Sequence, residues 1–152
     1  MPATNFEMVT EVQALLRRDF PVADKTLLNP NNANPLMDGE MLSLDSAYSL
    51  VRGAEGSLAF ALFAERGRFD TQAIGKATVL FGGTYEANTR VFTAAGLALG
   101  GRLMVSAAVT VDTLTKSGLI IHDGVATKDI IGYVTRLPAN NGGLLRFMQT
   151  LV

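Results

Sequence analysis

Beyond residue 36 the chain consists of short apolar segments separated by turns that contain glycine. Several segments alternate apolar and polar side chains with a period of two, which is the period of a half-buried strand. This pattern predicts a mainly β fold with little helix, arranged as a small β-barrel or sandwich. The predicted strands are residues 41–45, 48–52, 58–63, 77–81, 85–92, 103–105, 107–111, 119–121 and 129–135.

Turn signals separate the predicted strands. Gly82-Gly83 predicts a break, and His122-Asp123-Gly124 predicts a turn, because aspartate and glycine are favoured in chain reversals. Residues 133–137 and 144–151 flank a segment with two asparagines followed by two glycines, at positions 140–143. Asparagine followed by glycine tolerates the positive φ that a tight reversal requires. The last two segments therefore predict a C-terminal hairpin.

The first 36 residues follow a different pattern. Apolar residues at every second position fit a strand, and three of them equally fit one face of a helix. Residues 29–35 contain four asparagines and two prolines, which excludes regular structure there. We interpret residues 1–36 as an N-terminal arm with a turn-rich connector, followed by a β-rich domain of residues 37–152. The alternative is a first strand and a long loop within one compact domain.

The composition of the chain bears on which kinds of partner it can bind. Charged residues make up 18% of the chain, against about 25% in ordinary globular domains. So few charges indicate that partners cover part of the surface, although a surface rich in serine, threonine and asparagine explains the same number. The net charge of −1 argues against nucleic acid as a partner, because phosphate binding requires a basic patch.

Neither a membrane span nor a signal peptide is expected. Residues 91–111 are largely apolar, but three glycines interrupt them and Arg102 lies near their middle, which opposes insertion into a bilayer. The first residues lack the basic start and apolar run of a signal peptide, which predicts synthesis in the cytoplasm. The chain has no cysteine, so disulfides and thiolate chemistry are excluded.

Two places carry residues suited to acid–base chemistry. His122, the only histidine, precedes Asp123, but adjacent strand side chains point to opposite faces, so we interpret His122 as a surface turn residue. Asp38 and Glu40 lack the spaced oxygen ligands of a calcium loop, and we interpret them as a turn and a strand start. We therefore predict no enzyme activity, no cofactor and no metal. A small hydrolase or ligand-binding barrel that uses these four side chains is the alternative.

The basic residues are nine arginines and four lysines. Arginine is favoured at protein interfaces, where its planar group donates several hydrogen bonds, while lysine is depleted there. We expect contacts with the partner or between subunits in the arm, at the turn near residue 66 and in the closing hairpin. The candidates are Arg17, Arg18, Phe20, Asn31, Asn32, Arg66, Arg68, Arg146 and Phe147.

Three stretches carry a resemblance to a known group. They are Pro35–Asp45 (PLMDGEMLSLD) with the following Tyr48 and Arg52, Leu97–Val105 (LALGGRLMV), and Asp129–Pro138 (DIIGYVTRLP). Together they resemble the decoration (cement) proteins of tailed-phage capsids over most of residues 35–151.

The resemblance implies a structural virion protein without catalytic residues. Proteins of this group commonly form homotrimers outside the shell, where they bind the major capsid protein and stabilise the capsid. The implied partners are therefore the major capsid protein and further copies of the chain, with no nucleic acid and no membrane. The alternative within the virion is a tail-tube or head–tail connector subunit.

Overall fold

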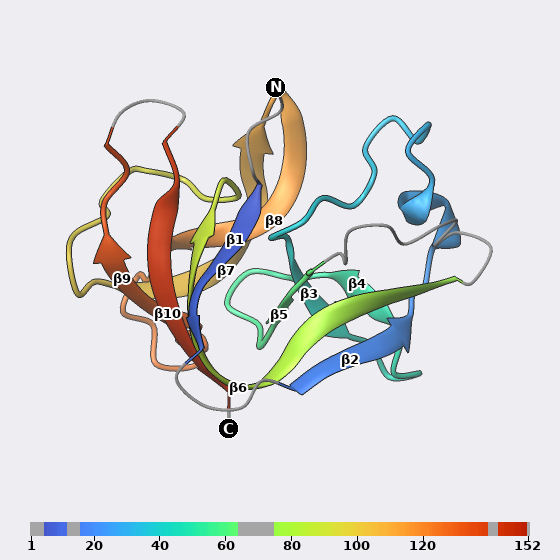
Figure 1. Ribbon diagram of the computed structural model, residues 1–152, viewed down its shortest axis with the longest axis horizontal. Coiled ribbons are helices and arrows are strands. Elements are labelled where there is room, and N and C mark those ends of the chain that lie inside the picture. Colours follow the sequence, from blue (N-terminus) through green and yellow to red (C-terminus); the bar gives the residue numbers. More distant parts are fainter. Residues whose placement is uncertain (1–4, 12–15, 64–74, 140–142, 152) are drawn as a thin grey trace.

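The computed structural model describes residues 5–11, 16–63, 75–139 and 143–151 (Figure 1). These residues form ten strands and one 3-10 helix, η1 (Lys25–Leu28). The predicted mainly β fold with little helix is confirmed. The strands are β1 (Phe6–Glu11), β2 (Leu16–Pro21), β3 (Met41–Leu44), β4 (Leu50–Arg52), β5 (Phe60–Ala61), β6 (Lys76–Thr89), β7 (Arg102–Val111), β8 (Leu114–Ile121), β9 (Gly132–Arg136) and β10 (Leu145–Leu151).

The strands form two antiparallel sheets. The larger sheet has the order β1-β6-β10-β9-β7-β8, with β2 also paired to β6, and the smaller one has the order β4-β3-β5. Just after β6, Phe92 forms a parallel bridge with Leu119 of β8, the last strand of the larger sheet. The larger sheet therefore curls until the chain leaving β6 meets β8, which gives it a barrel-like shape.

β6 connects the parts of the molecule. Its second half pairs with β1 and β10, and its first half pairs with β2. The break predicted at Gly82-Gly83 is wrong, because β6 is a continuous strand of 14 residues. Gly82 pairs with Leu16 and Gly83 with Leu151, so both glycines remain in the ladder. Glycine within a strand commonly marks a bend, and Figure 1 shows β6 bending between its two halves.

The N-terminal segments belong to the larger sheet. Residues 6–11 and 16–21, which we interpreted as part of an arm, form β1 and β2, and both run antiparallel to β6. The helical alternative depended on Val12, Leu15 and Leu16; the first two lie outside the described residues, and Leu16 is the first residue of β2. Residues 29–35 are irregular, as predicted, and asparagine side chains support their turns: Asn29 accepts a hydrogen bond from the Asn31 amide at 2.9 Å.

The predicted C-terminal hairpin is confirmed by the antiparallel pairing of β9 with β10. Residues 91–111, the apolar stretch discussed above, leave β6 and form β7. In the described ranges no helix is long and apolar enough to cross a membrane.

Aromatic side chains fill the core between β1, β6 and β10. The rings of Phe6, Tyr85 and Phe147 lie with centroids 6.0–6.5 Å apart. The buried Tyr85 hydroxyl donates to Gln149 Oε1, and Gln149 Nε2 donates to the Ala59 carbonyl at 3.3 Å. The core therefore contains a satisfied polar chain that links β6 and β10 to the start of β5.

Tyr85→Phe is expected to destabilise the protein in a pH-dependent way. Below pH 10 the loss is about 1–3 kcal/mol, because Gln149 loses its buried donor. Burial raises the pKa of Tyr85 above its usual value of 10.0, so the folded state keeps the proton after unfolded tyrosine ionises. Above pH 10 the free energy of unfolding of the wild type therefore falls by about 1.4 kcal/mol per pH unit. Phenylalanine does not titrate, so the difference in stability between the wild type and the variant becomes smaller. Denaturant titrations at pH 8 and pH 11 check this, and an unchanged difference would contradict it.

Candidate interaction surface

β2 presents two arginines on a sheet edge. Among the described strands, β2 pairs only with β6, through its full length. Arg17 and Arg18 are exposed, and as neighbours on a strand they point to opposite faces. An edge strand carries unpaired main-chain groups that can extend the sheet of another protein.

Aromatic rings support both guanidinium groups. The Arg17 guanidinium carbon lies 5.4 Å from the ring centroid of Phe63, and that of Arg18 lies 5.2 Å from Phe20 and 5.7 Å from Phe81. Each such contact stabilises by about 0.5–1 kcal/mol at an exposed site. Side chains that are already ordered lose less entropy on binding. We call β2 with its two stacked arginines the arginine edge.

The structure corrects the prediction that Phe20 and Phe147 are interface residues. Phe20 is 7% exposed and Phe147 is 0% exposed, so both pack in the core and cannot contact a partner. On β10 the alternation turns Phe147 inward and Arg146 outward. Arg146 remains accessible, and its Nε donates to Asn88 Oδ1 on β6 at 3.1 Å.

The connector asparagines differ in their surroundings. Asn31 is exposed, whereas Asn32 is partly buried and donates from Nδ2 to the Thr26 carbonyl at 3.1 Å. Asn32 therefore holds the connector against η1, and only Asn31 offers its side chain to a partner. Arg66 and Arg68 lie outside the described residues.

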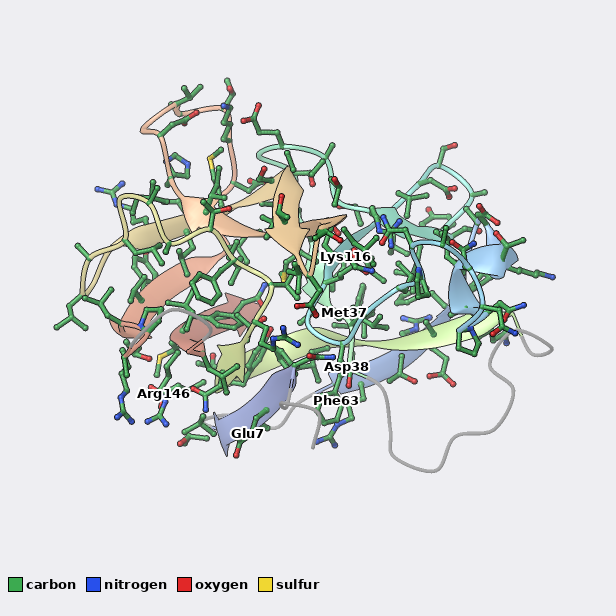
Figure 2. The ribbon with its side chains drawn as sticks, turned by 90° about the horizontal axis from the view of Figure 1, so that it is seen from above. Glu7, Met37, Asp38, Phe63, Lys116 and Arg146 are labelled. Atoms are coloured by element: carbon green, nitrogen blue, oxygen red, sulfur yellow. The ribbon has the colours of Figure 1, made fainter. Side chains whose placement is uncertain are left out.

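Glu40 is the centre of a buried ionic cluster. Its side chain is 0% exposed, with Oε1 2.8 Å from Arg52 Nε and Oε2 3.9 Å from Lys116 Nζ. The backbone amides of Met37 and Ser117 donate to the same carboxylate at 2.7 and 3.2 Å. Figure 2 labels Met37 and Lys116 at this place. We call Glu40, Arg52 and Lys116 the buried ionic cluster.

The cluster fastens the connector to the barrel. Arg52 donates to the Asn34 carbonyl at 2.9 Å, and Lys116 donates to the Pro35 carbonyl. Burial lowers the pKa of Lys116, while the negative charge of Glu40 opposes this change. Glu40 is therefore occupied by structural contacts, and the interpretation of Asp38–Glu40 as a simple turn and strand start missed them. The sequence contains no local signal for them, because the three members are far apart along the chain.

His122 and Asp123 hold a loop together and do not pair with each other in the way a catalytic base requires. His122 Nδ1 accepts from the Gly124 amide at 2.9 Å and Nε2 lies 3.0 Å from the Lys128 carbonyl, which fits the Nε2–H tautomer. The Asp123 carboxylate binds Lys128 Nζ at 2.5 Å, and this hydrogen bond lowers the pKa of Asp123. Glu40 on the one hand and His122 with Asp123 on the other therefore make separate sets of structural contacts.

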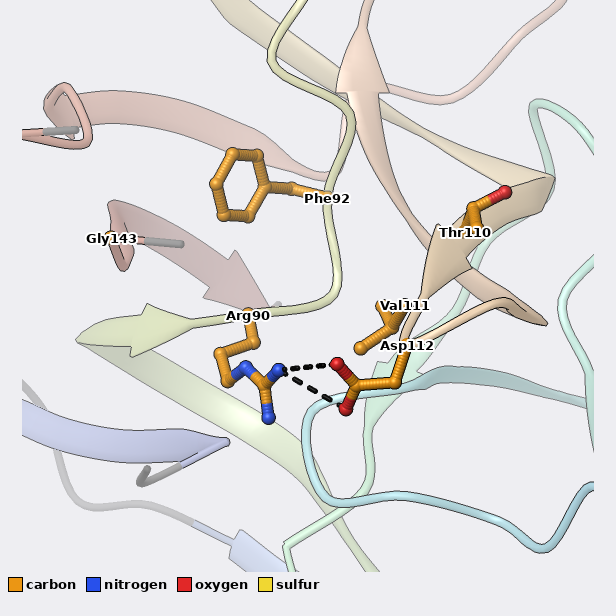
Figure 3. A pocket seen from close by; sticks show the side chains of 6 residues that line it. All are labelled: Arg90, Phe92, Thr110, Val111, Asp112 and Gly143. Atoms are coloured by element: carbon orange, nitrogen blue, oxygen red, sulfur yellow. Dashed lines mark hydrogen bonds and ion pairs between the residues drawn. The ribbon is translucent and has the colours of Figure 1, made fainter. Parts of the chain in front are cut away.

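A shallow, open pocket of about 200 Å³ lies beside the turn between β7 and β8 (Figure 3). Its charged groups neutralise each other, because Arg90 binds both Asp112 carboxylate oxygens at 3.1 and 3.2 Å. The residues that line it are Arg90, Phe92, Thr110, Val111, Asp112 and Gly143.

The residues that the structure describes contain no group of three or more acidic, histidine or cysteine side chains that could hold a metal. The arginine edge combines two guanidinium groups, aromatic support and a strand whose one partner among the described strands is β6. No protein-family model, no curated protein and no solved structure matches this chain.

Proposed function

We propose that this chain is a structural protein of a tailed-phage particle, which decorates the capsid by binding the exterior of the major capsid protein. The observation that carries the proposal is the arginine edge. Edge strands extend the sheets of partners through main-chain hydrogen bonds, and guanidinium groups bind carboxylates with two parallel hydrogen bonds. The resemblance of three stretches between residues 35 and 138 to decoration proteins supports the same role.

The physical role in this proposal is mechanical. Each copy forms a modest interface with the shell. Many copies together resist rupture of the shell, because once one contact has formed, further contacts of the same assembly form at a high effective concentration. Self-association as a homotrimer covers apolar side chains that the monomer leaves in water, among them Leu16 at 50% and Leu99 at 68% exposure.

Cryo-electron microscopy of the phage that encodes this chain tests the proposal. We expect density for the chain on the outside of the shell, with β2 against the major capsid protein. Density in the tail tube or at the head–tail junction would contradict the capsid role and favour the alternative virion subunit. Particles that lack the chain altogether would overturn both.

The double variant Arg17→Ala/Arg18→Ala is expected to weaken binding to undecorated, expanded shells about 10- to 100-fold. Truncating central arginines of an interface typically removes 1–3 kcal/mol of binding free energy. Sedimentation of the purified protein with the shells measures the effect, and circular dichroism establishes that the variant is folded.

Two further variants test whether the loss of binding is specific to the planar arginine groups of β2. Lys25→Ala removes one exposed positive charge outside β2, and it is expected to bind like the wild type. Arg17→Lys/Arg18→Lys keeps the charge but loses the planar group, so intermediate affinity is expected. Wild-type affinity of the double alanine variant would exclude the arginine edge as the contact.

A further inference from the structure

A second cationic surface lies on the outside of the barrel. Arg146 of β10 pairs with Arg136 of β9 beside a shift in register, and two residues further along β10 Met148 pairs with Tyr133. Tyr133 in turn pairs with Arg102 of β7. Side chains directly opposite on antiparallel strands have Cβ atoms about 4.5–5.5 Å apart, so these five form one patch. We call Arg102, Tyr133, Arg136, Arg146 and Met148 the barrel face.

The arginines of the barrel face have no acidic counterpart within the described residues. None of the ion pairs between those residues includes Arg102, Arg136 or Arg146. Among the described residues Arg146 donates to the neutral side chain of Asn88, whose Nδ2 donates in turn to Glu7 Oε2 at 3.4 Å. Like charges directly opposite on neighbouring strands are destabilising. We therefore expect the Arg136–Arg146 pair to lower the stability of the free protein, and an external anion that bridges the two groups would remove this effect.

The other side chains of the face point to a protein as the source of that anion. Tyr133 is 49% exposed and Met148 is partly exposed. Arginine, tyrosine and methionine are enriched in protein interfaces, where lysine is depleted, and the barrel face contains no lysine.

Acidic residues limit the length of the cationic patch. Glu86 of β6 stands opposite Met148, and Glu7 of β1 stands opposite Asn88 in the row of Arg146. Figure 2 shows Glu7 and Arg146 on the same side of the molecule. These carboxylates would repel a continuous polyanion such as DNA, whose binding depends on many phosphate contacts. A short carboxylate cluster avoids them.

We propose that the barrel face binds an acidic protein surface, whose carboxylates bridge Arg136 and Arg146 while Tyr133 packs at the centre. The inference goes beyond the proposed function, because it assigns a second contact surface that needs no capsid. In Figure 1 β9 and β10 lie on the opposite side of the view from β2, so the two surfaces can engage different partners at the same time.

Titration of the isotope-labelled protein with a tri-glutamate peptide, which is a short carboxylate cluster, tests the inference by nuclear magnetic resonance. We expect amide shifts concentrated in β7, β9 and β10 at low salt, and apparent affinity at least 10-fold lower for Arg136→Ala/Arg146→Ala. Arg17→Ala/Arg18→Ala is expected to leave these shifts unchanged. Equal shifts in the Arg136→Ala/Arg146→Ala variant, or larger shifts in the same strands with a DNA duplex or phosphatidylserine vesicles, would overturn it.

Arg136→Glu separates binding from folding. It is expected to raise Tm by about 1–3 °C, because the like-charge pair becomes a cross-strand ion pair, and to abolish the peptide shifts in β9 and β10. Lys25→Glu makes the same change in net charge elsewhere, and it is expected to alter apparent affinity less than twofold. A lower Tm for Arg136→Glu, or equal loss of binding in both variants, would contradict the inference. These experiments use no capsid, so a negative result would contradict the proposed role of the barrel face without bearing on the proposed capsid role.

Discussion

Replacing Glu40 by alanine is expected to lower the free energy of unfolding by about 3–5 kcal/mol, because it leaves Lys116 buried without its anion. Lys116 is 1% exposed, while Arg52 is 23% exposed and can reach water. The substitution also removes the acceptor for the amides of Met37 and Ser117. Domains are typically stable by only about 5–15 kcal/mol, so the expected loss is a large share of the total. Guanidinium titration followed by circular dichroism measures it.

An exposed ion pair supplies the matched control for Glu40. Glu55 is 62% exposed and lies 3.7 Å from Lys128, and Glu55→Ala is expected to change stability by about 0–1 kcal/mol. Glu40→Leu combined with Lys116→Met should recover most of the loss, because replacing a buried ion pair by apolar groups of similar volume is often neutral. If Glu40→Ala costs no more than Glu55→Ala, the buried ionic cluster does not hold the connector.

Gly118→Ala is expected to destabilise the protein by about 3 kcal/mol, at the upper end of the range for overpacking. A Cβ at Gly118 would lie 2.4 Å from the backbone oxygen of Val91, a distance that real Cβ atoms essentially never show. The same oxygen accepts a hydrogen bond from the Leu119 amide at 3.0 Å. The methyl group would therefore separate β8 from the chain that leaves β6, at the point where the larger sheet closes. Thermal unfolding and denaturant titration measure the effect.

A second strand glycine serves as the control for this substitution. At Gly82 an added Cβ would lie 3.3 Å from the Cβ of Leu16, the first residue of the edge strand β2, so a shift of a few tenths of an ångström at this strand end would relieve the contact. Gly82→Ala is expected to change stability by less than about 1 kcal/mol, since alanine removes backbone freedom from the unfolded chain and adds no backbone clash. Equal losses for the two variants would show that closure at Val91 does not limit stability.

Local patterns in the chain determined most of the strands. The C-terminal hairpin joins segments that are close in sequence, so alternation and turn residues were sufficient to predict it. The excess of arginine over lysine identified Arg17, Arg18 and Arg146 as contact candidates, and this remains a prediction. Turn chemistry also predicted the irregular connector, because asparagine side chains form hydrogen bonds with nearby backbone amides.

Only the tertiary structure decided which distant segments meet. β6 continues through Gly82-Gly83 because β2 and β10 supply ladder partners on either side of the bend, and local propensity contains no information about those partners. The burial of Lys116 depends on Glu40, which lies 76 residues earlier in the chain (116 − 40). Phe63 and Phe81 support the arginine edge across the fold in the same way.

The sequence by itself therefore determined the β-rich class, most of the strands and the C-terminal hairpin, since these depend on neighbours along the chain. The tertiary structure decided the barrel-like closure, the inward direction of Phe20 and Phe147, and the paired arginines of the barrel face. The physical reason is that strand pairing and burial depend on contacts between residues far apart in the chain. Whether a polar side chain is buried in a structural contact or exposed to a partner therefore depends on the residues that the fold places beside it.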